Sequence, residues 1–123
     1  MKAKDALGRR GEDLAAAFLE VAGFRVVARN WRCPLGEIDI VAHHDGTVVV
    51  VEVKTRTTDA FGHPFEAITP AKLKRLHLLS AAWVTAHADA GEARRRPPVR
   101  VDVIGILCPP GGVPAIQHLR AVS

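Results

Sequence analysis

Residues 36–56 read GEIDIVAHHDGTVVVVEVKTR, and this stretch decides the fold. Within it, Asp45-Gly46 is a strong signal for a two-residue type I′ turn, and it separates two runs typical of β-strands, residues 37–43 and 47–56. The second run includes residues 48–51, four valines that are apolar on both faces, which is typical of a central strand covered on both sides. The stretch therefore predicts an antiparallel hairpin inside a sandwiched sheet.

Amphipathic helices are predicted before and after this hairpin. Residues 5–22 carry apolar side chains at a spacing of three and four, and Gly23 follows as a helix stop. Thr69 and Pro70 form an N-cap followed by proline at the first helical position, so a second helix should run from there to about Ala88. Its predicted inward stripe consists of Leu73, Leu76, His77, Ser80, Trp83 and Val84.

The remaining segments complete an α/β pattern. Further strands are predicted at residues 24–29, 99–107 and 116–122. Loops are predicted at residues 30–36 and 57–69, and a basic connector at residues 89–98. The order α-β-β-β-α-β-β predicts a mixed central sheet flanked by helices, in one domain that covers residues 1–123.

The composition is that of a globular protein. Hydrophobic residues make up 48% and charged residues 24% of the 123 residues, which excludes a disordered or fibrous chain. No apolar run approaches the roughly 20 residues of a membrane span, and the first residues lead into no apolar signal segment. We therefore expect a cytoplasmic protein with no membrane partner.

A positive charge of +4 permits an acidic partner such as a nucleic acid. The basic residues gather in three groups, Arg94-Arg95-Arg96 with Arg100, Lys72 with Lys74-Arg75, and Arg9-Arg10. For each group the alternative is an ordinary solvated surface.

The predicted turn fixes a register in which residues paired across the hairpin sum to 91. Asp39 then lies opposite Glu52, and Glu37 lies opposite Lys54. Because side chains alternate along a strand, all four project from the same face of the sheet. A three-residue loop with a bulge would shift the register by one, so this pairing depends on the turn type.

Two opposed carboxylates need compensation. At a Cβ separation of about 5 Å, Asp39 and Glu52 repel by about 3 kcal/mol at an effective dielectric constant of about 20. A shared Mg²⁺ or Mn²⁺ ion would offset this repulsion, since both ions prefer oxygen ligands. Lys54 on the same face could then orient or deprotonate an attacking water, or stabilise charge on a phosphate.

A purely structural interpretation of these four residues is also open. In it, Glu37 and Lys54 form a cross-strand salt bridge, while nearby arginines or a shared proton neutralise Asp39 and Glu52.

Two segments of the hairpin resemble a known signature. Residues 36–41 and 51–56 resemble the motif of PD-(D/E)xK nucleases, with Ile38 where that motif has proline. Along nearly its whole length the chain is similar to the YraN family of uncharacterised proteins, whose nearest fold relatives are the archaeal Holliday junction resolvases. Outside the hairpin, the positions that carry this resemblance are Gly8, Gly11-Glu12, Arg29-Asn30, Phe61-Gly62, Pro64, Lys72, Arg100 to Asp102 with Val103, and Ile116.

The resemblance implies a restriction-endonuclease-like three-layer fold and a catalytic site. It implies that Asp39, Glu52 and the carbonyl of Val53 bind the metal ion and that Lys54 assists the nucleophilic water. It also implies that Glu12 is the additional helical acid of such resolvases. The alternative for Glu12 is a carboxylate that stabilises the positive end of its helix.

The implied function is a metal-dependent endonuclease that hydrolyses DNA, with branched or structured DNA as the expected substrate. Arg10, Arg56 and Lys72 are then candidates for contacts with the nucleic acid, and a homodimer is expected because such resolvases cut two strands symmetrically. The alternative function is a non-catalytic module that binds nucleic acid or protein and retains the nuclease fold.

Four further residues have predictions of their own. Asp102 lies in an apolar strand, so we expect a structural role in which Arg100 or a main-chain donor pairs with it. His77 is expected in the core, as is Trp83. Trp31 lies in the predicted loop beside two arginines and is the better candidate for stacking on unpaired bases.

Overall fold

The computed structural model describes residues 3–60, 62–88 and 96–123. Phe61, the basic residues Arg94 and Arg95, and most of the predicted connector at 89–98 lie outside the described residues. The elements are α1 (Ala3–Val21), β1 (Arg25–Cys33), β2 (Gly36–His44), β3 (Thr47–Arg56), the 3₁₀ helix η1 (Pro64–Ala67), α2 (Pro70–His87), β4 (Val99–Leu107) and β5 (Ala115–Leu119).

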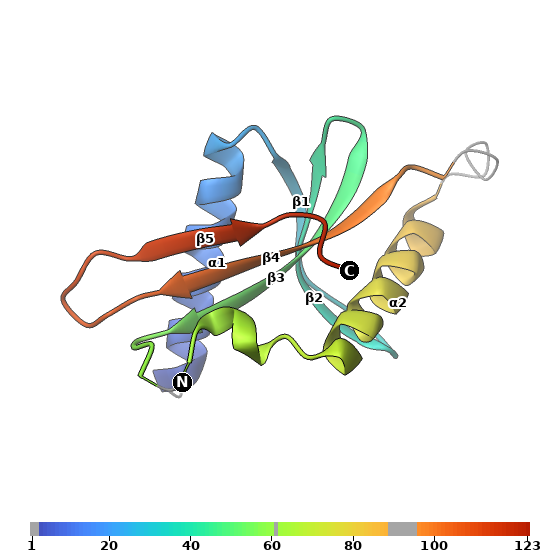
Figure 1. Cartoon of the computed structure of the whole chain (residues 1–123). Helices are drawn as coiled ribbons and strands as arrows, with labels where there is room; N and C mark the ends of the chain where they lie inside the picture. Colours follow the sequence, from blue (N-terminus) through green and yellow to red (C-terminus); the bar gives the residue numbers. More distant parts are fainter. Residues whose placement is uncertain (1–2, 61, 89–95) are drawn as a thin grey trace.

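The five strands form one mixed sheet in the order β1-β2-β3-β4-β5 (Figure 1). Neighbouring strands are antiparallel except β3 and β4, which are parallel and are joined through α2. A parallel pair needs such a crossover, because a tight turn can join only antiparallel strands. The predicted α/β fold with a mixed sheet is therefore confirmed.

Alternate residues of β3 pack against different helices. Val49 and Val51 belong to a buried cluster that includes residues of α1, whereas Val48 and Val50 belong to a second cluster that includes residues of α2. Successive side chains of a strand point to opposite faces, so the two helices cover opposite faces of the sheet. Figure 1 shows α1 passing behind the strands. The prediction of a central strand covered on both sides is confirmed.

The turn between β2 and β3 has the predicted conformation. Asp45 and Gly46 have φ angles of 50° and 76°, and two positive values in succession define a type I′ turn. The ladder pairs His44 with Thr47 and continues to Ile40 and Val51, whose numbers sum to 91. The predicted register is therefore confirmed as far as this last pair.

The N-terminus of α2 is capped as predicted. The Thr69 hydroxyl accepts a hydrogen bond from the Lys72 backbone N–H at 3.1 Å, and Pro70 occupies the first turn. Proline is suited to this place because its missing N–H would have no partner inside the helix.

Three local predictions were wrong. The predicted loop at 30–36 is mostly strand, because β1 continues to Cys33 by pairing Trp31 with Ile38 and Cys33 with Gly36. Trp31 consequently packs edge-on against the buried Trp83, with their ring centroids 5.3 Å apart. The predicted loop at 57–69 contains η1.

The third error concerns the inward face of α2. His77 is exposed, and Leu79, which the predicted stripe omitted, is buried. The buried face of α2 is centred on Leu76, Leu79 and Trp83, which pack against buried residues of β2 and β3.

Close packing of α1 against β3 depends on Gly11. A Cβ atom added at Gly11 would lie 1.8 Å from Oγ1 of Thr55, whereas one added at Gly8 would meet nothing within 4 Å. Gly11→Ala should therefore lower the free energy of unfolding by about 1–3 kcal/mol, because the helix must move away from the strand.

Gly8→Ala is the matched control on the same helix, and it should raise the stability by up to about 1 kcal/mol through helix propensity alone. Urea unfolding followed by circular dichroism measures both variants. Equal effects of the two substitutions would contradict this packing.

Within the described residues, neither helix combines the length and the apolar character that crossing a bilayer requires.

Candidate metal centre

A cavity of about 590 Å³ brings together most of the predicted site residues. It lies between the N-terminal parts of α1 and α2, at the end of β3. The predicted site residues that line it are Glu12, Asp39, Glu52, Val53, Lys54 and Lys72. Arg10 and Arg56 are not among its lining residues.

Asp39 lies where β2 and β3 separate. The ladder between these strands ends at Ile40 and Val51, and the Oδ2 atom of Asp39 accepts a hydrogen bond from the Val53 N–H at 2.9 Å. The carboxylate thus takes the place of the next backbone partner in the ladder. Because the N–H and C=O groups of one strand residue point to the same edge, the Val53 carbonyl points toward the Asp39 side as well.

The carboxylates of Asp39 and Glu52 interact directly, as the predicted register requires. Burial, a hydrogen bond with Glu52 and the negative charge of Glu52 raise the pKa of Asp39 from 3.8 to about 7, outweighing the hydrogen bond from Val53 and the charge of Lys54. Glu52 itself is buried, with 7% of its surface exposed. The pair therefore shares a proton below about pH 7, because water solvates a second negative charge poorly at this place.

Two lysines stand beside this acidic pair. Nζ of Lys72 lies 3.4 Å from Oε2 of Glu52. Burial and a hydrogen bond with Lys72 lower the pKa of Lys54. Burial alone would lower the pKa of Lys72 too, but its hydrogen bond with Lys54 and the charge of Glu52 raise it. Of the two amines, Lys54 is thus the one that gives up a proton more readily.

Glu12 adds a third carboxylate to the cavity. Burial and the negative charges of Asp39 and Glu37 raise the pKa of Glu12, against the opposing charge of Arg29. Its Oε1 atom is buried and has no hydrogen-bond partner. A buried oxygen of this kind costs free energy unless a ligand or ion satisfies it.

Glu37 has a different partner from the one that the cross-strand salt bridge would give it. Its Oε2 atom lies 3.5 Å from Nε of Arg32 on β1. Among the described residues, Glu37 therefore forms its ion pair with Arg32. Both Glu37 and Lys54 still line the cavity. Within the described part of the chain, the cross-strand salt bridge between Glu37 and Lys54 is therefore not formed.

The donor set fits a hard divalent cation. No three His, Cys, Asp or Glu side chains in the described ranges are spaced as a ready metal cluster. A Mg²⁺ or Mn²⁺ ion would instead rely on the carboxylates of Asp39 and Glu52 and on the Val53 carbonyl, with water completing the shell. Mg²⁺ in particular retains several waters and is usually held by one or two carboxylates. The negative charge of Asp39 contributes to the raised pKa of Glu12, and the Oε1 atom of Glu12 is buried without a hydrogen-bond partner. Both observations support a cation in this cavity.

The sequence did not reveal how close Lys72 lies to Glu52. Lys72 was predicted as a nucleic-acid contact. The structure places its amine beside the buried carboxylate of Glu52. One signal pointed there, because Thr69-Pro70 starts α2 and so puts Lys72 in its first turn. Residues 57–69, which include η1, connect β3 to that turn.

Asp102 has the structural surroundings that were predicted for it. It is fully buried, and its carboxylate accepts hydrogen bonds from Arg100 at 2.8 and 3.0 Å, from Nε2 of His118 at 2.7 Å and from the Ala121 N–H at 3.0 Å. Burial alone would raise the pKa of Asp102, but these hydrogen bonds lower it to about 2. The charged network fastens the C-terminal end of the chain to β4.

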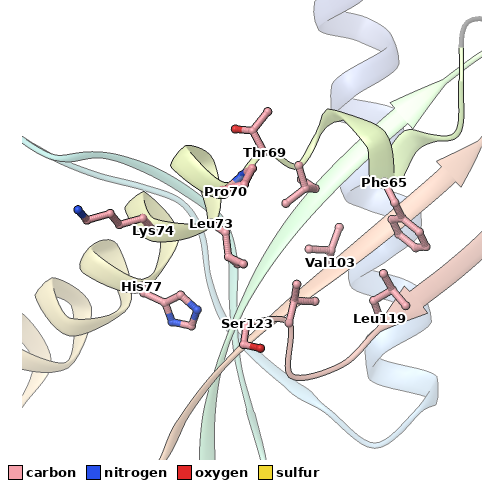
Figure 2. A pocket seen from close by; sticks show the side chains of 11 residues that line it. Phe65, Thr69, Pro70, Leu73, Lys74, His77, Val103, Leu119 and Ser123 are labelled. Atoms are coloured by element: carbon pink, nitrogen blue, oxygen red, sulfur yellow. The ribbon is translucent and has the colours of Figure 1, made fainter.

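A second cavity of about 650 Å³ lies on the other side of α2. Apolar side chains of Phe65, Leu73, Val103 and Leu119 surround it (Figure 2). Among the described residues, no Asp or Glu side chain lines this cavity. It consequently offers no acidic side chain to a hard divalent cation, whereas acidic residues gather in the first cavity.

The raised pKa of Asp39 predicts how stability depends on pH in the absence of metal. Its folded-state pKa of about 7 exceeds the value of 3.8, so this group stabilises the fold below about pH 4, and that contribution is lost as the pH rises through about 7. In EDTA, the melting temperature of the wild type should therefore fall relative to that of Asp39→Asn between these pH values.

Asparagine keeps an oxygen that can accept the Val53 N–H, so the variant removes the charge and little else. Melting curves that run parallel for the two proteins over this pH range would contradict the prediction.

Comparisons with known proteins give a consistent picture. A family model described as "Uncharacterised protein family UPF0102" matches residues 11–106. The chain is 54% identical over 123 residues to a UPF0102 protein of Arthrobacter sp. (strain FB24), covering all of both chains. It is 52% identical over 115 residues to one of Clavibacter michiganensis subsp. michiganensis, covering 94% of this chain and 93% of that protein. It is also 47% identical over 125 residues to one of Streptomyces griseus subsp. griseus, covering all of both chains.

Proposed function

Because the chain belongs to the uncharacterised protein family UPF0102, whose description names no reaction, we propose its function from the site: a metal-dependent endonuclease that hydrolyses phosphodiester bonds in DNA. The observation that carries this proposal is the meeting of Asp39 and Glu52, with Lys54 beside them, in one cavity. Metal-assisted hydrolysis of a phosphodiester uses such an arrangement, namely a cation site next to a group that can accept or donate a proton.

The sequence signature supports the same chemistry. Residues 36–41 and 51–56 resemble the PD-(D/E)xK motif, and the two segments belong to the adjacent strands β2 and β3. On this proposal the fold is of the restriction-endonuclease-like class, and branched or structured DNA is the expected substrate.

In the proposed reaction, a divalent ion held by Asp39, Glu52 and the Val53 carbonyl would supply Lewis-acid stabilisation of charge on the phosphate. Lys54 orients the attacking water and accepts its proton at Nζ, which its lowered pKa favours. Lys72 has a raised pKa, remains an ammonium and donates hydrogen bonds to phosphate oxygens. The water oxygen bonds to phosphorus, the bond to the leaving oxygen breaks, and the leaving oxygen takes up a proton.

The proposal is tested by incubating the protein with branched, single-stranded and duplex DNA in Mg²⁺, in Mn²⁺ and in EDTA. We expect cleavage of at least one substrate with metal and none in EDTA. Absence of cleavage with every substrate in both metals would contradict the proposal.

One observation favours the non-catalytic alternative. Lys72 contacts Glu52 and so offsets part of the negative charge without a metal ion. A binding module that retains the fold would then bind DNA in a salt-sensitive manner. Binding that survives the double substitution Asp39→Ala and Glu52→Ala, with no turnover by the wild type, would favour this alternative.

A further inference from the structure

A third cavity lies at the other end of α2 from the candidate metal centre. It has a volume of about 990 Å³ and is bounded by the C-terminal half of α2, by β1 and by the β2-β3 turn. Its composition differs from that of the other two cavities, since aromatic and cationic side chains dominate its polar lining. We refer to it as the aromatic pocket.

Three aromatic rings are packed together in the aromatic pocket. Trp83 and His87 are stacked with centroids 3.5 Å apart and planes inclined by 19°. Trp31 meets both of them edge-on, at 5.3 and 5.8 Å. Trp83 is buried, Trp31 is half-buried and His87 is exposed, so the stack ends in a ring that a planar ligand can reach.

The position of His87 is fixed by a hydrogen bond. Its Nδ1 atom lies 2.9 Å from the Trp83 carbonyl, and since a carbonyl only accepts, the imidazole donates from this nitrogen. The ring is thereby held over Trp83. A further planar group could extend the stack on the outer side of His87.

Cationic groups border the same cavity. Arg25 and Arg96 both line it, and among its described lining residues none is acidic. The Arg25 guanidinium donates to Nδ1 of His43 at 3.1 Å, which orients the group while leaving other N–H donors free. The cavity therefore complements a ligand that carries both a negative charge and a planar ring.

A break in the β1 ladder exposes part of the wall. The pairing of β1 with β2 shifts between Val26 and Ala28, so Val27 is the extra residue of a bulge. Val27 lines the pocket and is 37% exposed. The bulge thus presents an apolar side chain beside the rings.

We propose that the aromatic pocket binds an unpaired nucleotide of single-stranded DNA, with its base stacked on His87 beside Trp31 and its phosphate contacted by Arg25. The proposal names single-stranded DNA as the substrate class of the proposed nuclease. It rests on that proposed function, because the bound strand must continue from the aromatic pocket toward Asp39 and Glu52. Aromatic rings next to a basic border are the usual means of binding single strands, because every base has a face that can stack.

The two cavities lie along the same side of α2. Arg75, Leu76 and Leu79 of α2 line the candidate metal centre, and Trp83, Val84 and His87 continue this stripe into the aromatic pocket. Lys72 and His87 are separated by about 22 Å at 1.5 Å per residue. A single strand that keeps the duplex rise of about 3.4 Å per nucleotide would span this distance with about six to seven nucleotides.

Intrinsic fluorescence provides a direct test. The chain has two tryptophans and no tyrosine, and both tryptophans line the aromatic pocket. An oligothymidylate of about 12 nucleotides, titrated in EDTA so that no cleavage occurs, should quench this fluorescence. A fully paired duplex of the same length should quench it much less, because its bases are already stacked.

His87→Ala and Arg25→Ala should each weaken binding of the oligothymidylate about fivefold or more, as measured by quenching and by anisotropy of a labelled strand. The matched control is His77→Ala, another exposed histidine on α2 that lies on the far side of the helix and should leave binding unchanged. Circular dichroism melts verify that each variant is folded.

Absence of quenching, equal quenching by duplex and single strand, or equal binding by His87→Ala and the wild type would each overturn the proposal. Failure of the nuclease proposal has a different signature. Quenching with the predicted variant effects but no cleavage in Mg²⁺ or Mn²⁺ would contradict the nuclease proposal and support nucleotide binding in the aromatic pocket. Cleavage without quenching would support the nuclease proposal and contradict nucleotide binding in the aromatic pocket.

Discussion

Replacing Asp39 with Asn should lower metal-dependent DNA cleavage by about a thousandfold or more. Stabilisation of the transition state by a bound cation is worth several kcal/mol, and each 1.4 kcal/mol changes a rate about tenfold. Asp39 is held toward the cavity by the Val53 N–H and interacts directly with Glu52, so a neutral amide at this position removes a proposed ligand while it preserves the hydrogen bond. Single-turnover cleavage of a labelled substrate in Mg²⁺ measures the effect.

Glu37→Gln is the matched control for this experiment. Glu37 lines the same cavity and lies on the same strand, but its carboxylate pairs with Arg32. We expect a loss of no more than about 10–100-fold, as for a residue that only supports the electrostatics of the site. An Asp39→Asn protein that cleaves as fast as the wild type, or that is impaired no more than Glu37→Gln, would contradict the assigned role of Asp39.

Replacing Asp102 with Asn should lower the free energy of unfolding by about 3–5 kcal/mol. Asp102 is fully buried, and the substitution leaves Arg100, whose side chain is only 21% exposed, without its negative partner. It also weakens the hydrogen bonds that hold His118 and the Ala121 N–H. For a chain of this length, the melting temperature should fall by roughly 10–20 °C.

An exposed ion pair provides the comparison for Asp102. The carboxylate of Asp13 lies 2.7 Å from Arg29, about as close as Asp102 lies to Arg100 at 2.8 Å, yet its side chain is 62% exposed. Asp13→Asn should cost no more than about 1 kcal/mol, since water solvates the separated charges. Similar losses for the two variants would mean that burial does not determine the importance of the Asp102 network.

The hairpin and its register were predictable because they follow from local chemistry. Asp45-Gly46 tolerates two positive φ angles in succession, and the valines before Glu52 require cover on both faces of β3. Once the turn is fixed, alternation along the strands brings Asp39 and Glu52 to one face. The start of α2 followed from Thr69-Pro70 in the same way.

Features that depend on packing between distant segments were not predictable from local pattern. Trp31 was expected in a loop, but pairing with Ile38 extends β1 through it, and no local signal reports that a neighbouring strand edge is available. His77 was expected in the core because its spacing matches the apolar stripe, yet α2 is rotated so that Leu79 is buried instead. The contact between Lys72 and Glu52 likewise depends on how the helix rests on the sheet.

Titration calorimetry with Mn²⁺ tests the central claim most directly, which is that Asp39 and Glu52 hold one divalent ion between them. We predict that the wild type binds one Mn²⁺ per chain, that Asp39→Asn and Glu52→Gln lose this binding, and that Glu37→Gln retains it. A wild-type protein that binds no Mn²⁺, or an Asp39→Asn protein that binds it with unchanged affinity, would contradict the claim.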